Sequence, residues 1–341
     1  MIGSGNARSW AVMGTSVTIY VAGDDPDSTL AATRTEAIDR AARWFFLVEE
    51  CCSRFLPDSE LSQLSSRIAL PVRVSEMLYH AVDFALAIAE ESDGAFDPTM
   101  GLEMEARGFN REHASGRLVS TPVSAPRDVT YRDVHLDPDA RTITLRRPLL
   151  LDLGAVAKGL AIDLAARELA TFGSVAIDAG GDLFLGGRRH DGGPWKVGIR
   201  HPRGEAEFLD VVYVSDRAVC TSGDYERRSK SGGTHILRPA TKMPVTDVAS
   251  VTVVAETAML ADALATAAFV LGPERGIALL EQHEVEGLLV TQALERYETR
   301  GFRSAYSILQ DAQGAADDHP GNPAGAGDAG RGHAAVSGRP R

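Results

Sequence analysis

The sequence of 341 residues is poor in cysteine and has no long apolar run. Its three cysteines, Cys51, Cys52 and Cys220, are odd in number and lack the spacing of zinc ligands, which favours reduced thiols over a disulfide framework or a zinc site. No apolar stretch reaches the roughly 20 residues that a spanning helix needs, and the N-terminal segment lacks the apolar core of a signal peptide. We therefore expect no membrane span and a cytoplasmic location.

Positive charge is also scarce. The chain has 35 Lys and Arg against 47 Asp and Glu, a formal net charge of −12, which excludes a general affinity for nucleic acid or anionic membranes. Two nucleotide-binding motifs are absent as well: there is no GxxxxGK[ST] loop, and "GSGNAR" at residues 3–8 lacks a third glycine and a preceding strand. A site for an anion must therefore be local.

The sequence does contain a mixture of helical and strand patterns. Residues 29–50 have helical periodicity, and "SEMLYHAVDFALAIAEESDG" predicts a helix with Ser75 as N-cap and Gly94 as its stop. Residues 134–147 predict a hairpin, residues 175–255 are rich in strands, and residues 256–273 predict a helix closed by Gly272 and Pro273. These patterns predict an α+β fold with a mostly antiparallel sheet and packed helices.

Composition also sets the domain boundaries that we expect. Residues 312–341 consist mainly of Gly, Ala, Pro and Asp, which leave too little apolar surface to offset the entropy of ordering. We expect a flexible N-terminus over residues 1–9, one folded domain over residues 10–311, and a disordered C-terminal tail over residues 312–341.

A lysine stands where an apolar segment leads into a helix. "LLLDLGAVAKGLAIDLA", residues 149–165, reads as a buried strand followed by a helix, with Lys158 in the first turn. The free N–H groups of a helix start, the helix dipole and a lysine together favour an anionic ligand such as phosphate. The alternative is a lysine that is simply solvated.

Two further motifs carry oxygen or nitrogen groups with a possible chemical role. Asp262 and Thr266 stand at i and i+4 of an otherwise apolar helix, so their oxygens share one face and suit a hard cation such as Mg²⁺. The alternative is that each bonds nearby backbone. His235 lies in the glycine-punctuated segment 220–239 and has the intrinsic pKa of a general base, although most lone histidines are structural.

Nine segments, taken in order, resemble the FAD:protein FMN transferase (ApbE) family over roughly residues 10–300. They are "AVMGTSVTIYV", "CSRFLPDSELSQLS", "GAFDPTM", "LDLGAVAKGLAIDLA", "AGGDLFLGG", "WKVGIRHP", "TSGDYERR", "HILRP" and "ADALATAAFVLG". The resemblance implies a T-fold-like α+β domain that uses Mg²⁺ and takes FAD as its substrate. It further implies that FMN is moved from FAD onto a Thr or Ser hydroxyl of a target protein, with release of AMP.

The resemblance also implies roles for individual residues. Asp152 and Lys158 would contact FAD, His235 would be the base, and the backbone carbonyl of Ala155 would ligate magnesium. Magnesium would further be held at Asp262 and Thr266, with Ala265 at a third position that offers only backbone. Contacts to the flavin or adenine are implied for six further residues: Met13, Phe55, Ala95, Phe96, Asp97 and Ile236.

Some residues depart from the family pattern. Thr234 stands in place of a His, Arg238 in place of an Asp, Lys242 in place of a glycine, and Asp178 in place of an Asn. We expect Arg238 to lower the pKa of His235, with a role on phosphate or in solvent as the alternative. These departures leave an FAD pyrophosphatase and a non-catalytic flavin-binding protein as alternative functions. The chain lacks an acceptor motif of the type Ser/Thr-Gly-Ala-Ser/Thr, so we expect a separate acceptor protein.

Deletion of residues 312–341 tests the domain boundary. Because this composition forms no packed core, we expect the melting temperature to change by less than about 2 °C and FAD binding to be retained. Differential scanning calorimetry of the full and shortened chains measures the effect, and a large loss of stability would assign the segment to the fold.

Overall fold

The fold is built on one large antiparallel sheet. The computed structural model describes residues 5–23, 28–112, 115–123, 126, 128–204, 208–225 and 234–302. Within these ranges, eight strands pair in the order β1-β2-β6-β7-β10-β13-β14-β15, and every pairing is antiparallel. The strands are β1 (Gly5–Val12), β2 (Thr15–Ala22), β6 (Ser174–Ala179), β7 (Asp182–Gly187), β10 (Arg217–Gly223), β13 (Val248–Ala255), β14 (Glu286–Thr291) and β15 (Arg296–Glu298).

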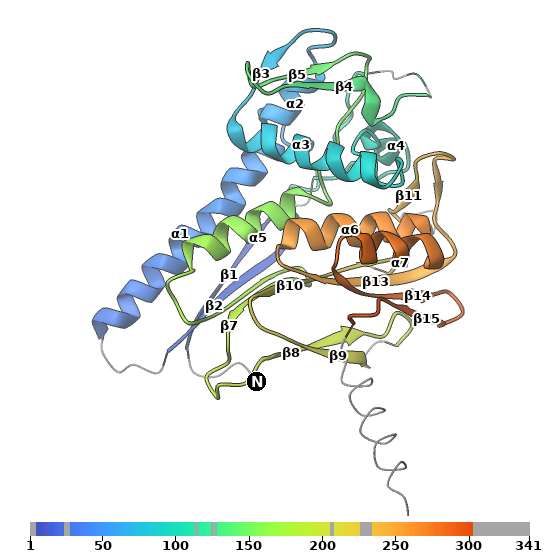
Figure 1. Ribbon diagram of the computed structural model, residues 1–341. Helices are drawn as coiled ribbons and strands as arrows, with labels where there is room; N and C mark the ends of the chain where they lie inside the picture. The colour runs from blue at the N-terminus through green and yellow to red at the C-terminus, as the bar shows by residue number, and fades with distance from the viewer. Residues whose placement is uncertain are drawn as a thin grey trace, which may run out of the picture.

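The two faces of this sheet are covered by different elements (Figure 1). Four helices lie along one face, namely α1 (Ser28–Cys52), α5 (Ala157–Glu168), α6 (Ala258–Leu271) and α7 (Pro273–Gln282). A hairpin of β8 (Trp195–Arg200) and β9 (Phe208–Val214) lies against the other face. The sequence therefore folds as the predicted α+β domain with an antiparallel sheet.

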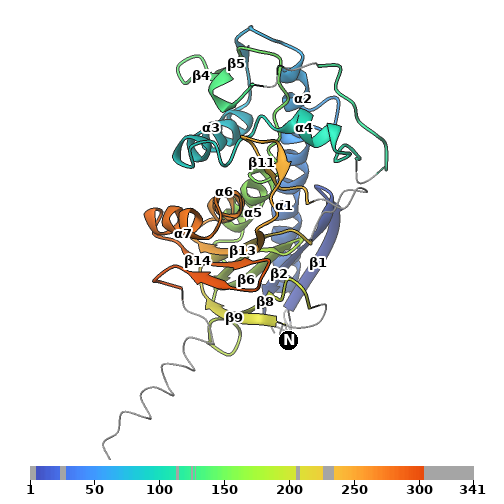
Figure 2. The ribbon, with the colours of Figure 1, turned by 90° about the vertical axis from the view of Figure 1, so that its right-hand side faces the viewer.

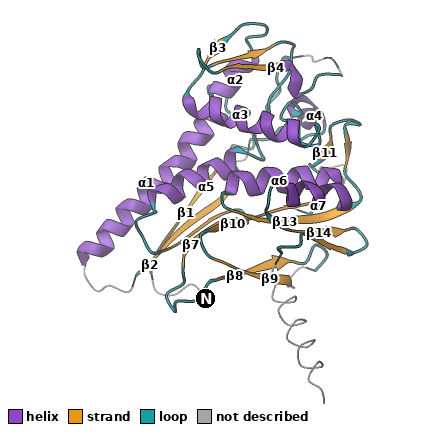
Figure 3. Cartoon of the chain, in the orientation of Figure 1, coloured by secondary structure: helices purple, strands orange, loops and turns teal. Residues whose placement is uncertain are grey.

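A third group of elements lies beyond the helical layer (Figures 2 and 3). It contains α2 (Glu60–Ser65), α3 (Glu76–Glu91), α4 (Gly101–Ala106), the one-turn helix η1 (Tyr131–Asp133) and a small antiparallel sheet in the order β3-β5-β4. The strands of this sheet are β3 (Val72–Arg73), β5 (Thr142–Leu145) and β4 (Val134–Asp137), of which the last two form the predicted hairpin. A short hairpin of β11 (Leu237–Arg238) and β12 (Met243–Pro244) approaches this group.

Strand β13 shows why the sheet is buried on both sides. All eight of its residues are buried. Val251 and Val253 belong to the core under the helices, whereas Val254 belongs to the second core under β8 and β9. Successive side chains of a strand point to opposite faces, so a strand covered on both sides must be apolar at nearly every position.

The helix ends follow from the predicted signals. The Ser75 hydroxyl accepts a hydrogen bond from the Leu78 N–H at 3.2 Å, which caps α3. Gly94 has a φ of +73° and donates its N–H to the Ala89 carbonyl at 2.8 Å, so it ends the turn after α3. Gly272, with a φ of +81°, separates α6 from α7, as predicted. Thr257 caps α6, and this cap was not predicted.

Some expected boundaries are wrong. The segment from Leu149 is not a strand, since only Leu150 makes a single bridge, to Met100 of the loop before α4. Residues 5–9 belong to β1 and pair with β2, so the ordered domain begins earlier than residue 10. The tail over residues 312–341 lies outside the described residues. None of the described helices is both long and apolar enough to cross a bilayer.

Helices α5 and α6 meet at unusually close range. A Cβ placed on Gly159 of α5 would lie 2.4 Å from the Cα and 2.5 Å from the N of Met259 at the start of α6. One turn further along α5, the carboxylate of Asp163 accepts the N–H groups of Ala258 at 2.7 Å and Met259 at 3.0 Å. Asp163 therefore caps a helix to which it does not belong, and Gly159 gives the space for that contact.

We expect Gly159→Ala to destabilise the protein by about 2 kcal/mol, because the added methyl group collides with backbone that cannot move aside. In an open helix the same change is stabilising, since alanine has the higher helix propensity. Gly173→Ala, in the loop between α5 and β6, is the control for an added methyl group, as nothing lies within 4 Å of its position. Urea unfolding measures both, and equal stabilities would contradict the close approach.

Candidate functional site

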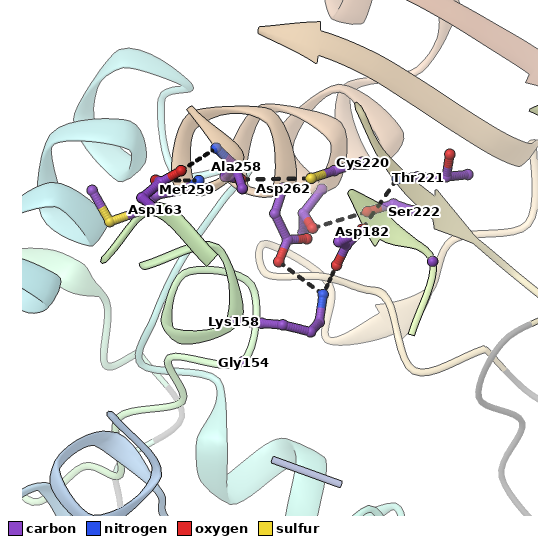
Figure 4. A network of polar contacts seen from close by, with 12 residues as sticks. Gly154, Lys158, Asp163, Asp182, Cys220, Thr221, Ser222, Ala258, Met259 and Asp262 are labelled. Atoms are coloured by element: carbon purple, nitrogen blue, oxygen red, sulfur yellow. Dashed lines mark hydrogen bonds and ion pairs between the residues drawn. The ribbon is translucent and has the colours of Figure 1, made fainter. Parts of the chain in front are cut away.

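The centre of the site is Lys158, in the first turn of α5 (Figure 4). Its ammonium group forms ion pairs with Asp182 at the start of β7 and, at 3.2 Å, with Asp262 of α6. The Lys158 side chain is only 18% exposed, and Asp182 and Asp262 are 4% and 6% exposed. Lys158 is therefore not the solvated lysine of the alternative interpretation.

Asp182 was missed in the sequence, although it directly follows the Gly-Gly pair of "AGGDLFLGG". Gly180 and Gly181 have φ values of +67° and +97°, which form the tight turn between β6 and β7. The Asp178 carboxylate accepts the Gly181 N–H at 2.9 Å, as an Asn side-chain carbonyl would, so this departure from the family pattern keeps the turn. A carboxylate placed immediately after such a turn was the available signal.

Asp262 and Thr266 lie on one face of α6, as their spacing predicted. The Thr266 hydroxyl is 3.1 Å from the hydroxyl of Ser222 on β10, and the Asp262 carboxylate faces Lys158. The side chains of Asp262 and Thr266 thus contact residues of other elements, and these contacts differ from the hydrogen bonds to nearby backbone that the alternative predicts. Ala265 stands between Asp262 and Thr266 in the sequence, is fully buried and has no side-chain atom that could ligate a metal. Ala155 lies in the turn before α5.

Asp152 is held by a buried arginine. Arg54, 5% exposed, donates its Nε to one oxygen of Asp152 at 2.7 Å, and the Gly154 N–H donates to the other oxygen at 2.8 Å. Breaking a buried ion pair by removing one partner leaves the other charge uncompensated, at a cost of about 3–5 kcal/mol. Asp152 therefore fixes the loop before α5, whatever else it contacts.

Arg54 also connects the aromatic residues to the histidine. Its guanidinium lies over the Phe55 ring, 4.1 Å from the ring centroid, and its NH2 group donates to the Phe109 carbonyl at 2.6 Å. The Phe109 ring meets the imidazole of His235 edge-on, at 6.3 Å between centroids. Asp152, Phe55 and His235, which are far apart in the sequence, thus belong to one connected cluster.

The segment over residues 94–100 is ordered by Asp97. One carboxylate oxygen of Asp97 accepts from the N–H and the hydroxyl of Thr99, and the other accepts from the Tyr131 N–H at 3.1 Å. Burial raises the pKa of Asp97, and these hydrogen bonds oppose that rise. The segment adjoins Asp152, whose N–H donates to the Pro98 carbonyl at 2.7 Å.

The other predicted contact residues occupy defined positions. Ala95 is half-buried against the core, and the Phe96 N–H donates to the Ser92 hydroxyl at 3.0 Å. Ile236 is buried and donates its N–H to the Thr234 hydroxyl at 3.3 Å. Met13, with a φ of +53° in the β1–β2 turn, donates its N–H to the Glu49 carboxylate at 2.9 Å.

Two further departures from the family pattern, at Lys242 and Arg238, lie in defined surroundings. Lys242 has a φ of +58° in the turn between β11 and β12, a conformation that favours glycine and explains why the family pattern has one there. Arg238 forms an ion pair with Asp247, 3.2 Å away. That partner weakens the field of Arg238 elsewhere, so its effect on the pKa of His235 stays a prediction.

The residues around Lys158 suit a magnesium ion. Asp182, Asp262, Thr266 and Ser222 offer oxygen atoms, the donors that Mg²⁺ prefers, and Mg²⁺ takes few ligands from protein. Two nearly buried carboxylates that share one ammonium group also leave one negative charge for a further cation. Over the described ranges, no cluster of three or more His, Cys, Asp or Glu side chains is placed to hold a metal.

The antiparallel sheet covered by helices defines an α+β domain, and its polar centre contains one lysine, two carboxylates and two hydroxyls. The model of the ApbE family matches residues 13–289, and the chain belongs to this family. It is 31% identical over 270 residues to the FAD:protein FMN transferase of Vibrio cholerae, covering 75% of this chain and 80% of that one.

Two more relatives agree with this assignment. The FAD:protein FMN transferase of Treponema pallidum is 36% identical over 250 residues, covering 66% of this chain and 68% of that one. The crystal structure of the ApbE protein from Thermotoga maritima superposes with a TM-score of 0.75 at 30% identity, covering 87% of this chain and 97% of that one. The predicted family and fold are therefore confirmed.

Asp163, which joins the two helices of the site, should make stability depend on pH. Burial raises its pKa from 3.8 to about 6, so the folded protein binds this proton more tightly than the unfolded chain. The contribution is present below pH 4 and is lost as pH rises to about 6, by on the order of 3 kcal/mol.

We expect Asp163→Asn to remove this part of the pH dependence. Between pH 4 and pH 7, the free energy of unfolding of the variant should fall less than that of the unchanged protein. The weaker cap lowers the free energy of unfolding of the variant by the same amount at every pH. Urea unfolding at both pH values measures the difference, and a difference that is the same at both would refute the assignment.

Proposed function

We propose that this protein is a flavin transferase that moves FMN from FAD onto a Thr or Ser hydroxyl of a separate target protein, with AMP as the leaving group. The observation that carries the proposal is the convergence of Lys158 and Asp262, from two helices, on one acidic centre. Membership in the ApbE family and the names of its relatives support the reaction type.

The reaction breaks the phosphoanhydride bond of FAD and forms a phosphate ester bond to the acceptor. The acceptor hydroxyl oxygen attacks the FMN-side phosphorus of FAD, and the bond from that phosphorus to the bridging oxygen of AMP breaks. The hydroxyl proton passes to a ring nitrogen of His235, and AMP leaves with the bridging oxygen. A neutral imidazole suits this step because its unperturbed pKa of about 6.5 lies near neutrality.

The positive charges held at the acidic centre would neutralise the charge of the phosphates. Asp262 and Thr266, with the backbone carbonyl of Ala155, would hold Mg²⁺, which supplies neutralisation of phosphoryl oxygens when bound. The ammonium group of Lys158 would add its positive charge to that of Mg²⁺ beside the phosphates. The chain as a whole cannot attract phosphates, because its net charge is −12. Ala265, which has no side-chain oxygen and is fully buried, is the weakest member of the predicted set.

The aromatic cluster would hold the planar rings of FAD. Phe55, with the Arg54 guanidinium on its ring, presents a flat surface beside Asp152. A cavity of about 410 Å³ is lined by α4 and the segments around it, among others by Thr99, Asn110 and Lys242, and none of the predicted ring-contact residues lines it. Its size is in the range of small-molecule sites.

The test is a transfer assay with the full chain, FAD, Mg²⁺ and a peptide that carries a Ser/Thr-Gly-Ala-Ser/Thr motif. We expect an FMN adduct of the peptide by mass spectrometry and an equal amount of AMP by chromatography. Asp262→Ala should reduce transfer about 100-fold, and His235→Ala by about 10² to 10⁴ with FAD binding retained.

The controls are Asp83→Ala and His80→Ala, which remove an exposed carboxylate and an exposed imidazole of α3 and should leave transfer unchanged. AMP without an adduct would identify a pyrophosphatase that uses water as the acceptor. FAD binding with neither product would identify a binding protein, and full transfer by Asp262→Ala would remove the acidic centre from the reaction.

A further inference from the structure

The two carboxylates that share Lys158 are held in different ways. Asp182 pairs with Ala179 across the β6–β7 turn, and its second oxygen accepts the Thr221 N–H of β10 at 3.4 Å. Asp262 projects from α6, and the contact that the described residues give its carboxylate is with Lys158 (Figure 4). Asp182 is thus tied to two strands of the sheet, whereas Asp262 is restrained chiefly by the ammonium group.

Lysine can exchange partners here without a change of backbone. The ammonium group sits on a four-carbon stem with several rotatable bonds, and both carboxylates already lie within its reach. In the described part of the chain, no second ion pair reaches either carboxylate. A divalent cation at Asp262 would repel the ammonium group at this range, because two positive charges would then share one nearly buried oxygen.

We propose that Lys158 is an internal cation that neutralises Asp262 in the metal-free protein, and that a divalent cation displaces it from Asp262 while Asp182 retains it. This inference rests on the proposed function, which places the divalent cation at Asp262. Asp182 then acts as a positioning residue: it holds the displaced ammonium group beside the metal, where substrate phosphates bind between the two positive charges. The ammonium group and the metal compete for Asp262, so metal affinity is low until FAD is present.

The competition is measured with Mn²⁺, which accepts the same oxygen ligands as Mg²⁺. The signal of free Mn²⁺ in electron paramagnetic resonance gives its affinity for the full chain without FAD. Lys158→Met removes the ammonium group at similar length, and we expect it to bind Mn²⁺ at least about tenfold more tightly. Lys196→Met, on an exposed position of β8, is the matched control and should bind like the unchanged protein. An affinity of Lys158→Met equal to or below that of the control overturns the inference.

A double variant isolates the role of Asp182. If Asp182 acts only through Lys158, Asp182→Asn alone weakens Mn²⁺ binding, because the ammonium group then stays on Asp262. The double variant, Asp182→Asn with Lys158→Met, should then bind Mn²⁺ like Lys158→Met alone, within about twofold. A double variant about tenfold weaker than Lys158→Met would make Asp182 a metal ligand and overturn its positioning role. If Lys158→Met does not fold, Lys158→Gln provides the same neutral side chain with hydrogen-bonding capacity.

The transfer assay separates this inference from the proposed function. If the unchanged protein transfers FMN and Asp262→Ala loses both transfer and Mn²⁺ binding, the proposed function holds, and an unchanged affinity in Lys158→Met then refutes the competition alone. If no FMN adduct forms although Lys158→Met binds Mn²⁺ more tightly, the competition holds and the transfer reaction is refuted.

Discussion

The close contact between α5 and the start of α6 is the constraint on which the site depends. Lys158 and Asp262 come from these two helices, and their ammonium and carboxylate groups meet only if the helices are at this distance and register. Gly159 permits the approach because it has no side chain, and Asp163 fixes it because its carboxylate binds the first N–H groups of α6. Both residues stand within five positions of Lys158, so a short stretch of α5 carries the cation and also sets its position.

The scarcity of positive charge in this chain gives Lys158 its importance. An anionic dinucleotide has little electrostatic reason to approach a surface with a net charge of −12. Attraction has to come from a small region in which cations are concentrated and partly shielded from water. The half-buried Lys158 and a metal on Asp262 would form that region, because the charge of the buried Arg54 is already paired with Asp152.

Local signals predicted much of this fold, and long-range partners explain what they missed. The cap at Ser75, the apolar run of β13 and the shared face of Asp262 and Thr266 depend on neighbours within a few residues, so the sequence displays them. The partners of Lys158 and Asp152 do not follow from spacing, because they lie far away in the sequence, on β7, on α6 and in the loop after α1. The apolar stretch from Leu149 predicted a strand, but burial alone made it apolar, since its one bridge in the described residues joins Leu150 to Met100, outside any sheet.

The separation of the site residues along the chain has a consequence for how the protein acquires its ligands. Arg54 and Asp152 are 98 residues apart, and Lys158 and Asp262 are 104 residues apart. Contacts of such long range close large loops, so they form late in folding and slow it. During synthesis, the segments up to β13 emerge before the helix that carries Asp262. A growing chain therefore cannot pair Lys158 with Asp262 before α6 has been made, and a ligand that needs both groups would bind only after the two helices have met.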